Sequence, residues 1–255
     1  TDYIKESRDL PTGTAVIYVD DNGDNTGYMG HFNIAVDGPA GAGKSTIARM
    51  VAEKLGFVYV DTGAMYRTMA LHFIRLGISP GDEEAIARAC RDVDVTICYK
   101  DGAQQVMLNG ENVTGLIRTE EVGGMASATS VYAPVRKKLV ELQQELARKT
   151  DVIMDGRDIG TCVLPDAPAK IYLTASVEVR AGRRFKELTE KGVGCTLKEI
   201  EEDIRERDYR DMNREHSPLR QAEDAVLLDS SGMTIEQVAD AIIRIACERG
   251  LEVGA

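Results

Sequence analysis

The stretch GPAGAGKST, residues 38–46, decides the fold of this chain because it fits the pattern G-x-x-x-x-G-K-[ST] in a fitting context. An apolar run typical of a strand precedes it, and an amphipathic helical pattern follows it. Gly38, Gly41 and Gly43 let the backbone curl so that successive N–H groups point inward around a phosphate, and the following helix adds the positive end of its dipole. The alternative, a glycine-rich turn without a ligand, would leave several amide donors and a lysine facing nothing.

Two side chains of this loop indicate the kind of ligand. Lys44 can reach the β and γ phosphates of a nucleoside triphosphate, and the Ser45 hydroxyl can ligate Mg²⁺. Three classes stay open at this point: a kinase for a small acceptor, a switch-type nucleotide hydrolase and an ATP-driven motor module. A GTP switch would normally carry an N-K-x-D guanine-recognition motif, which does not occur in the sequence. A motor or nucleic-acid enzyme would be expected to show a basic surface or further domains, and neither is evident.

The composition argues against broad binding to polyanions. The chain has 255 residues, with 31 Lys plus Arg against 42 Asp plus Glu and a formal net charge of −11. Because nucleic-acid and anionic-membrane binders need a broad positive field, we expect neither partner, and any anion site must be local. The five cysteines form neither a C-x-x-C pair nor a cluster with the histidines. No stretch is long and apolar enough to span a bilayer. The sequence therefore predicts a cytoplasmic protein with free thiols, by default a monomer.

The pattern along the chain predicts an α/β fold. Five short apolar runs are typical of buried strands: 32–36, 57–60, 152–154, 170–174 and 225–228. Helical patterns separate them: the apolar stripe Ile47, Met50, Val51 and Leu55, stopped by Gly56; the stripe Val135, Leu139, Leu142 and Leu146; and the capping-box pattern Thr234-x-x-Gln237 before a third helix. Strands buried on both faces and alternating with helices predict a doubly wound, five-stranded parallel sheet.

Two segments have a different texture. Residues 94–114 carry alternating, β-branched-rich pieces around the turn dipeptides Asp101-Gly102 and Asn109-Gly110, which predicts a small antiparallel insertion. Residues 1–30 are predicted to be a leader or extension outside the functional fold. Within them, alternating Asp20, Asn22 and Asp24 suggest a calcium loop, but the sixth position is not Gly and the twelfth is not Glu, so a turn-rich, solvated segment is the better interpretation.

Polar and charged side chains also follow two of the other predicted strands. Asp155 ends one of them, which suits a carboxylate beside the phosphate loop that holds Mg²⁺ through water. Arg157 and Asp158 come next; they could be an exposed ion pair, but their place at the ligand edge of the sheet favours a role in binding. After the second strand, Thr62 could cap the following helix or contact a ligand, and Arg67 lies one turn further on.

Together these motifs resemble the bacterial-type cytidylate kinases, within the P-loop nucleoside monophosphate kinases. The resemblance covers about residues 32–250 and rests on seven motifs in order: GPAGAGKST, DTGAMYR (61–67), IRT (117–119), DGRDIG (155–160), VRAGRR (179–184), RERDYRDMNR (205–214) and LLDSSGMTIEQV (227–238). It implies a kinase domain over 31–255, with a core formed by 31–90, 150–180 and 217–255, an acceptor-binding insertion at about 91–149 and a helical lid at about 181–216. It also implies transfer of the γ-phosphoryl group of ATP to CMP or dCMP.

The resemblance also implies roles for individual residues. ATP would be bound by Gly38, Pro39, Ala40, Gly41, Ala42, Gly43, Lys44, Ser45 and Thr46, with Arg180 and Arg184 either facing the triphosphate or lying on the surface. CMP would be bound by Thr62, Arg67, Ser127, Arg136, Arg157, Asp158, Arg207 and Asp211, of which Ser127, Arg136 and Asp158 would recognise the cytosine edge. Lys44, Arg157, Arg207 and Arg214 would be catalytic, and Mg²⁺ would be held by Ser45 and, through water, Asp155. The alternatives are a related kinase acting on UMP or AMP and a nucleotide-binding regulatory protein that retains the fold.

The chemistry fits the implied role. A nucleoside monophosphate already presents an anionic oxygen, so the transfer needs charge neutralisation, alignment and exclusion of water rather than a strong general base. The segment ERDYRDMNR (206–214) provides charges of this kind. We predict that one helical stripe begins with apolar Leu197, Ile200 and Ile204 and continues as Arg207, Asp211 and Arg214, while Asp208 only balances charge outside this seam. An ordinary solvated face is the competing interpretation.

Overall fold

A five-stranded parallel sheet lies at the centre of the computed structural model, which describes residues 18–19, 25–26, 31–100, 103–190 and 192–252. The strand order is β10-β9-β3-β8-β4, and every neighbouring pair is parallel. The strands are β3 (Asn33–Asp37), β4 (Val58–Asp61), β8 (Val152–Gly156), β9 (Ala169–Thr174) and β10 (Val226–Asp229). The five runs predicted from the sequence are confirmed as these strands.

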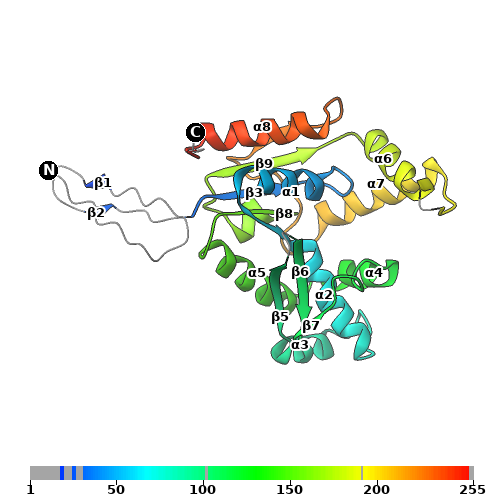
Figure 1. The fold of residues 1–255 in the computed structure, drawn as a ribbon. Helices are drawn as coiled ribbons and strands as arrows, with labels where there is room; N and C mark the ends of the chain where they lie inside the picture. Colours follow the sequence, from blue (N-terminus) through cyan, green and yellow to red (C-terminus); the bar gives the residue numbers. More distant parts are fainter. Residues whose placement is uncertain (1–17, 20–24, 27–30, 101–102, 191, 253–255) are drawn as a thin grey trace. The chain divides into compact units, whose positions relative to one another are not determined.

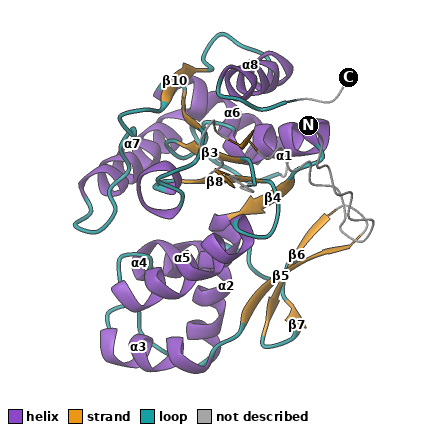
Figure 2. Ribbon diagram, turned by 90° about the vertical axis from the view of Figure 1, so that its left-hand side faces the viewer, coloured by secondary structure: helices purple, strands orange, loops and turns teal. Residues whose placement is uncertain are grey.

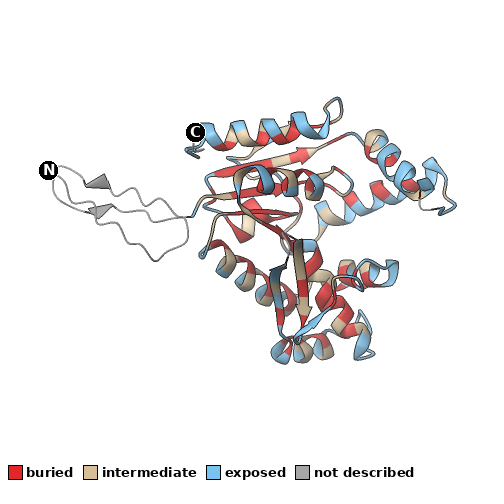
Figure 3. Ribbon diagram, viewed as in Figure 1, coloured by how far each residue is buried: buried red, intermediate tan, exposed pale blue. Residues whose placement is uncertain are grey.

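Helices pack on both faces of the sheet, which explains why most positions along its strands are apolar. Along β3, Ile34 and Val36 point to one face, where α1 (Lys44–Leu55) and α8 (Ile235–Glu248) pack. Ala35, between them, points to the other face, where α2 (Thr62–Arg75) and α5 (Ala133–Ala147) contribute to a second core. Figures 1 and 3 show the buried strands between these helices. Alternation between two apolar cores is the signature of a doubly wound sheet.

The predicted helix ends are confirmed in detail. α1 stops at Gly56, which takes a left-handed conformation with φ 70° that glycine adopts at little cost. α8 begins after Thr234, whose side chain accepts from the Gln237 N–H while the Gln237 side chain accepts from the Thr234 N–H. This is a complete capping box.

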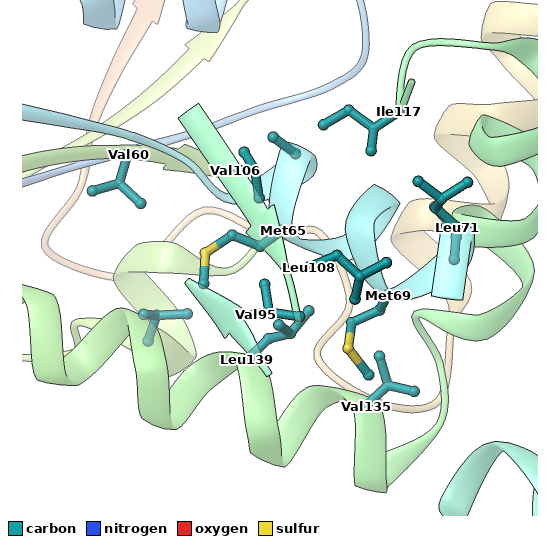
Figure 4. Close-up of a cluster of buried hydrophobic side chains, with 14 of the residues drawn as sticks. Val60, Met65, Met69, Leu71, Val95, Val106, Leu108, Ile117, Val135 and Leu139 are labelled. Atoms are coloured by element: carbon teal, nitrogen blue, oxygen red, sulfur yellow. The ribbon is translucent and has the colours of Figure 1, made fainter. Parts of the chain in front are cut away.

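The predicted antiparallel insertion is also confirmed. The strands β5 (Val95–Lys100), β6 (Ala103–Leu108) and β7 (Glu111–Asn112) form one antiparallel sheet. Asn109 and Gly110 form a turn with positive φ angles of 50° and 82°. Figure 2 shows this sheet beside α2, with the helices α3 (Glu83–Asp92) and α4 (Glu120–Thr129) in the same part of the molecule. Its apolar side chains Val95, Val106 and Leu108 join Met65, Met69 and Leu139 in one buried cluster (Figure 4).

Two helices after β9 form a smaller packed unit. α6 (Val177–Glu190) and α7 (Leu197–Asn213) enclose Ala181, Ile200 and Ile204. The predicted seam along α7 is partly wrong at both ends. Leu197 is 44% exposed, and the helix ends at Asn213, so Arg214 follows in extended backbone with ψ 143°. A bond from the Leu219 N–H to the Asp211 carbonyl brings the chain back at this point.

The N-terminal part is described by itself, because the chain divides after His31. β1 (Tyr18–Val19) pairs in antiparallel fashion with β2 (Asn25–Thr26). Most of the predicted leader at 1–30, the alternating residues Asp20, Asn22 and Asp24, and the Asp101-Gly102 dipeptide lie outside the described residues. None of the helices in the described ranges combines the length and apolar character needed to cross a membrane.

Candidate active site

The loop between β3 and α1 has the geometry of a phosphate cradle. Gly38, Gly41 and Gly43 have φ angles of 153°, 76° and 90°, which side chains with a Cβ rarely adopt. A Cβ on Gly38 would lie 1.9 Å from the Leu173 carbonyl oxygen, so only glycine fits beside β9. Because Gly43 directly precedes the first turn of α1, the unpaired N–H groups of that turn face the loop.

Two arginines of α6 hold the outer side of this loop. Arg180 Nη1 donates to the Ala40 carbonyl (3.0 Å), and Arg183 Nη1 donates to the Ala42 carbonyl (3.4 Å). In a trans peptide the C=O and the next N–H point in opposite directions. The Gly41 and Gly43 N–H groups therefore point away from these arginines, toward the concave side where a phosphate would lie.

Lys44 is folded back onto its own loop. Its ammonium is buried and donates to the carbonyls of Gly38 (2.8 Å) and Pro39 (2.7 Å). Burial lowers the pKa of Lys44 well below its ordinary value, and the positive charge of Arg157 lowers it further. The positive charges of Lys44 and Arg157 therefore repel each other, which would favour an anion between them.

Asp155 ends β8 beside the loop, as predicted. The register places it opposite Val36 of β3 and Asp61 of β4. Its Oδ2 accepts from the Ser45 hydroxyl (2.9 Å), and its Oδ1 accepts from the Tyr59 hydroxyl (2.8 Å). Burial, and then the nearby Asp61 charge, raise the pKa of this carboxyl. A hydroxyl and a carboxylate are oxygen ligands that suit Mg²⁺, and Mg²⁺ often takes only one or two protein ligands together with substrate phosphates and water.

A group of arginines gathers near the ends of the parallel strands. Arg157 pairs with Asp211 of α7 (Nε to Oδ2, 2.8 Å), which connects β8 with α7. The pKa of Arg67 is lowered by burial, with Arg118, Arg157 and Arg184 adding to the effect. For Arg207 the pKa is lowered by partial desolvation and then by the charge of Arg157. In the described part of the chain neither Arg67 nor Arg207 has a hydrogen bond or ion pair, so both are available to an anion.

Asp158 follows Arg157 in the chain and directly precedes η1 (Ile159–Val163), a short π-helical turn. It is buried and bonds to Arg136 of α5, and Arg214 Nη2 lies 3.6 Å from its second oxygen. The Arg136 guanidinium also lies 6.0 Å from the centre of the Tyr66 ring. A buried carboxylate held by two guanidinium groups is a preorganised charged group, which could accept a hydrogen bond from a ligand.

Ser127 of α4 does not bond to Asp158. It lines an open cleft of about 450 Å³ between α4 and the C-terminal end of α7. Asp211 and Arg214 line the same cleft, together with Tyr209 and Arg210. The structure therefore places two predicted acceptor-binding residues, Ser127 and Asp211, and the predicted catalytic residue Arg214 around one opening.

Asp208, Arg180 and Thr62 differ from the expectations, whereas Arg184 takes one of its two predicted positions, on the surface. Asp208 is buried, and its Oδ2 accepts from Arg180 Nη2 at 2.7 Å, so the prediction that it only balances surface charge is wrong. Arg180 is likewise not a surface arginine, since it also donates to the Ala175 carbonyl at 2.8 Å. Arg184 is exposed and pairs with Glu187. Asp61, not Thr62, caps α2, and the Thr62 hydroxyl donates to the Asp155 carbonyl at 2.7 Å.

Some residues of the site had no recognisable signal in the sequence. Asp37 accepts from the N–H groups of Ile159 (2.8 Å) and Gly160 (2.7 Å), and burial raises its pKa to about 6. It fixes η1, and with it Asp158, to the end of β3. Arg118 pairs with Asp61 (2.9 Å) in the charged group. Only the position of Asp37 directly before the glycine-rich loop could have suggested a role.

Comparisons with known proteins agree with this geometry. A family described as cytidylate kinase matches residues 34–248. The chain is 49% identical over 217 residues to a cytidylate kinase of Caldicellulosiruptor bescii, covering 85% of this chain and 96% of that relative. It is 50% identical to a cytidylate kinase of Lactobacillus johnsonii, covering 83% and 92%. A cytidylate kinase of Geobacter sulfurreducens is 46% identical, with 85% and 93% covered.

Proposed function

This chain belongs to the cytidylate kinase family, and from that membership we propose that it transfers the γ-phosphoryl group of ATP to CMP or dCMP, giving ADP and CDP or dCDP. The observation that carries the proposal is the position of Arg157. Its charge acts on Lys44 of the phosphate loop, and its side chain bonds to Asp211 of the cleft that Ser127 and Arg214 also line. A single guanidinium thus connects the triphosphate side with the acceptor side.

On the triphosphate side, the loop N–H groups would bind the β and γ phosphates. The Lys44 ammonium would exchange the carbonyls of Gly38 and Pro39 for phosphate oxygens. Mg²⁺, when bound, neutralises charge on these phosphates. Ser45 would hold it directly and Asp155 through water. Arg180 would act indirectly, because its donors already hold the loop carbonyl, Ala175 and Asp208.

On the acceptor side, Arg67 and Arg157 would hold the phosphate of CMP, and Arg207 and Arg214 would neutralise the charge that develops during transfer. Arg207 and Asp211 would also contact the sugar. The CMP phosphate is already anionic, so the arginines need only align it and exclude water. Closure of the proposed lid, about residues 181–216, would bring Arg207 and Arg214 to the phosphates.

Base recognition would rest on Asp158, Arg136 and Ser127. The exocyclic amine of cytosine is a hydrogen-bond donor and needs an acceptor, which a carboxylate provides. Uracil has a carbonyl at that position, so it would offer Asp158 no donor and would place a repulsive oxygen beside the carboxylate. A carboxylate acceptor at this position therefore favours CMP and dCMP over UMP.

The substrate is tested by coupled assays with ATP and, in parallel, CMP, dCMP, UMP, AMP and GMP. We expect rapid formation of CDP and dCDP and slow reaction with the other three. Absence of CDP formation from folded protein would overturn the proposal, and a faster rate with UMP or AMP would favour a related kinase. Binding of nucleotides without any turnover would favour a regulatory protein.

The remaining expectations are part of the same proposal. We expect Mg²⁺ dependence, a monomer, a cytoplasmic location and no nucleic-acid partner. Light scattering after gel filtration measures the mass of the particle in solution, and a mass of twice the chain's 27.8 kDa would contradict the monomer. Removal of Mg²⁺ by a chelator should abolish turnover, and its return should restore it.

A further inference from the structure

One tyrosine touches the proposed metal site from the neighbouring strand. We propose that Tyr59 is a positioning residue for Asp155, and that its hydroxyl fixes the rotation of this carboxylate so that Oδ2 faces Ser45. The inference rests on the proposed role of Ser45 and Asp155 in holding Mg²⁺. Tyr59 itself would not touch the metal or the nucleotide.

The sheet register explains why a tyrosine at this position reaches Asp155. Residues Tyr59 and Ile153 lie opposite each other in β4 and β8, and Asp155 lies two residues beyond Ile153. Since alternate residues point to the same face, Tyr59 and Asp155 emerge on the same side of the sheet. A tyrosine side chain is long enough to cross diagonally and donate to Asp155 Oδ1 at 2.8 Å. A phenylalanine would fill the same space without providing a donor.

The ring is held firmly enough to define the position of its hydroxyl. Tyr59 is 6% exposed and packs into the core beneath α1 and α8. The Arg49 guanidinium lies 5.4 Å from the ring centre. The backbone carbonyl of Tyr59 accepts from the Tyr99 hydroxyl at 2.5 Å, which fixes β4 from the side of the small antiparallel sheet. A donor on such a support has little freedom to follow a rotating carboxylate.

Asp155 needs this support because its terminal torsion is broad and roughly two-fold. Ser45 holds one oxygen, but its hydroxyl oxygen is the atom that the metal would share. Tyr59 holds the other oxygen, so its bond does not compete with the metal. Partners of this kind, which orient metal-holding groups, contribute about 10–100-fold to metal affinity.

The test compares Tyr59→Phe with the unaltered protein, using Mn²⁺ as the probe. Free Mn²⁺ is measured by electron paramagnetic resonance in the presence of a non-hydrolysable ATP analogue, at a temperature well below unfolding. We expect Tyr59→Phe to weaken Mn²⁺ binding by about tenfold, the lower end of that range. Binding of the analogue with a chelator present should change less than about twofold, because the loop itself is not altered.

Two further variants make the outcome decisive. Tyr132→Phe is the matched control, because it removes a hydroxyl that donates to the Pro80 carbonyl, and Mn²⁺ affinity should stay unchanged. Asp155→Asn tests the metal role itself. If Asp155→Asn lowers Mn²⁺ affinity but Tyr59→Phe does not, the inference is overturned while the proposed function stands. If neither variant changes it, both the metal role of Asp155 and the inference fail.

Discussion

Replacing Asp208 by alanine should destabilise the protein by about 3 kcal/mol. Asp208 Oδ2 and Arg180 Nη2 lie 2.7 Å apart, and the two side chains are only 12% and 5% exposed. Removing one partner of a buried ion pair costs about 3–5 kcal/mol, because the other charge stays buried without compensation. The lower value applies here because Arg180 would keep its hydrogen bonds to the carbonyls of Ala40 and Ala175. For a domain of this size the loss corresponds to a melting temperature lower by about 6–12 °C.

The assay is chemical or thermal unfolding of Asp208→Ala beside Asp203→Ala. Asp203 is an exposed acid on the same helix with no ion pair among the described residues, and its removal should change stability by less than about 0.5 kcal/mol. The double variant Arg180→Leu with Asp208→Leu should lose less than the sum of the single changes, because no unpaired charge remains. A loss below about 1 kcal/mol for Asp208→Ala would refute the argument that this pair is a buried, mutually dependent one.

Three other changes test separate parts of the site. The pKa of Asp37 is raised from 3.8 to about 6, so its contribution to stability is fully present below about pH 4 and is lost as the pH rises through about 6. Between pH 5 and 7.5 the unaltered protein should lose about 1.4 kcal/mol of unfolding free energy through this ionisation. Asp37→Asn lacks the ionisable group, so over this range its unfolding free energy should rise by that amount relative to the unaltered protein. Parallel pH profiles of the two proteins would contradict the prediction. Gly38→Ala should cost at least about 3 kcal/mol, because its Cβ meets the Leu173 carbonyl, whereas Gly182→Ala, with open space around the added carbon, should not destabilise; equal melting temperatures would disprove the clash. Asp158→Ala should lower the ratio of kcat/KM for CMP over UMP by about tenfold or more with little change in the KM for ATP, and an unchanged ratio would remove Asp158 from base recognition.

The sequence could predict the sheet because its strands carry their own pattern. In the run 32–36 every residue except Asn33 is apolar, since alternate residues serve two cores. The glycine-rich loop was predictable for a similar reason: each glycine satisfies a local backbone requirement that no distant residue changes. Capping of α8 depends on Thr234 and Gln237 alone, three positions apart. Features decided within a short segment can be read from that segment.

Pairing between distant segments could not be predicted in this way. Asp208 lies among five other charged residues of ERDYRDMNR, and nothing in that stretch distinguishes it from a solvated acid. Its burial depends on Arg180, 28 residues earlier, which in turn depends on the Ala40 carbonyl, 140 residues before it. Asp37 shows the same limit, because its partners are backbone N–H groups at Ile159 and Gly160, which have no sequence identity to recognise.

The ion pairs of the site explain how an acidic protein can bind two anionic nucleotides. Asp211 holds Arg157 and Asp61 holds Arg118, while Asp158 pairs with both Arg136 and Arg214. These carboxylates cancel much of the positive charge while they fix the guanidinium groups in place, so that little has to reorganise when a phosphate arrives.

The net attraction then falls to the arginines that no carboxylate holds. Among the described residues of the cluster these are Arg67 and Arg207, whose pKa values are lowered by desolvation and by neighbouring arginines. The negative charges of Asp61 and Asp211 offset only part of these effects, so a phosphate bound between the two arginines would relieve repulsion among the cations. If Arg67 and Arg207 bind the acceptor phosphate as proposed, part of the binding energy would come from a cost already present in the free protein. Paired arginines would instead have to give up an existing partner, so Arg67 and Arg207 should contribute more to phosphate affinity than their paired neighbours do.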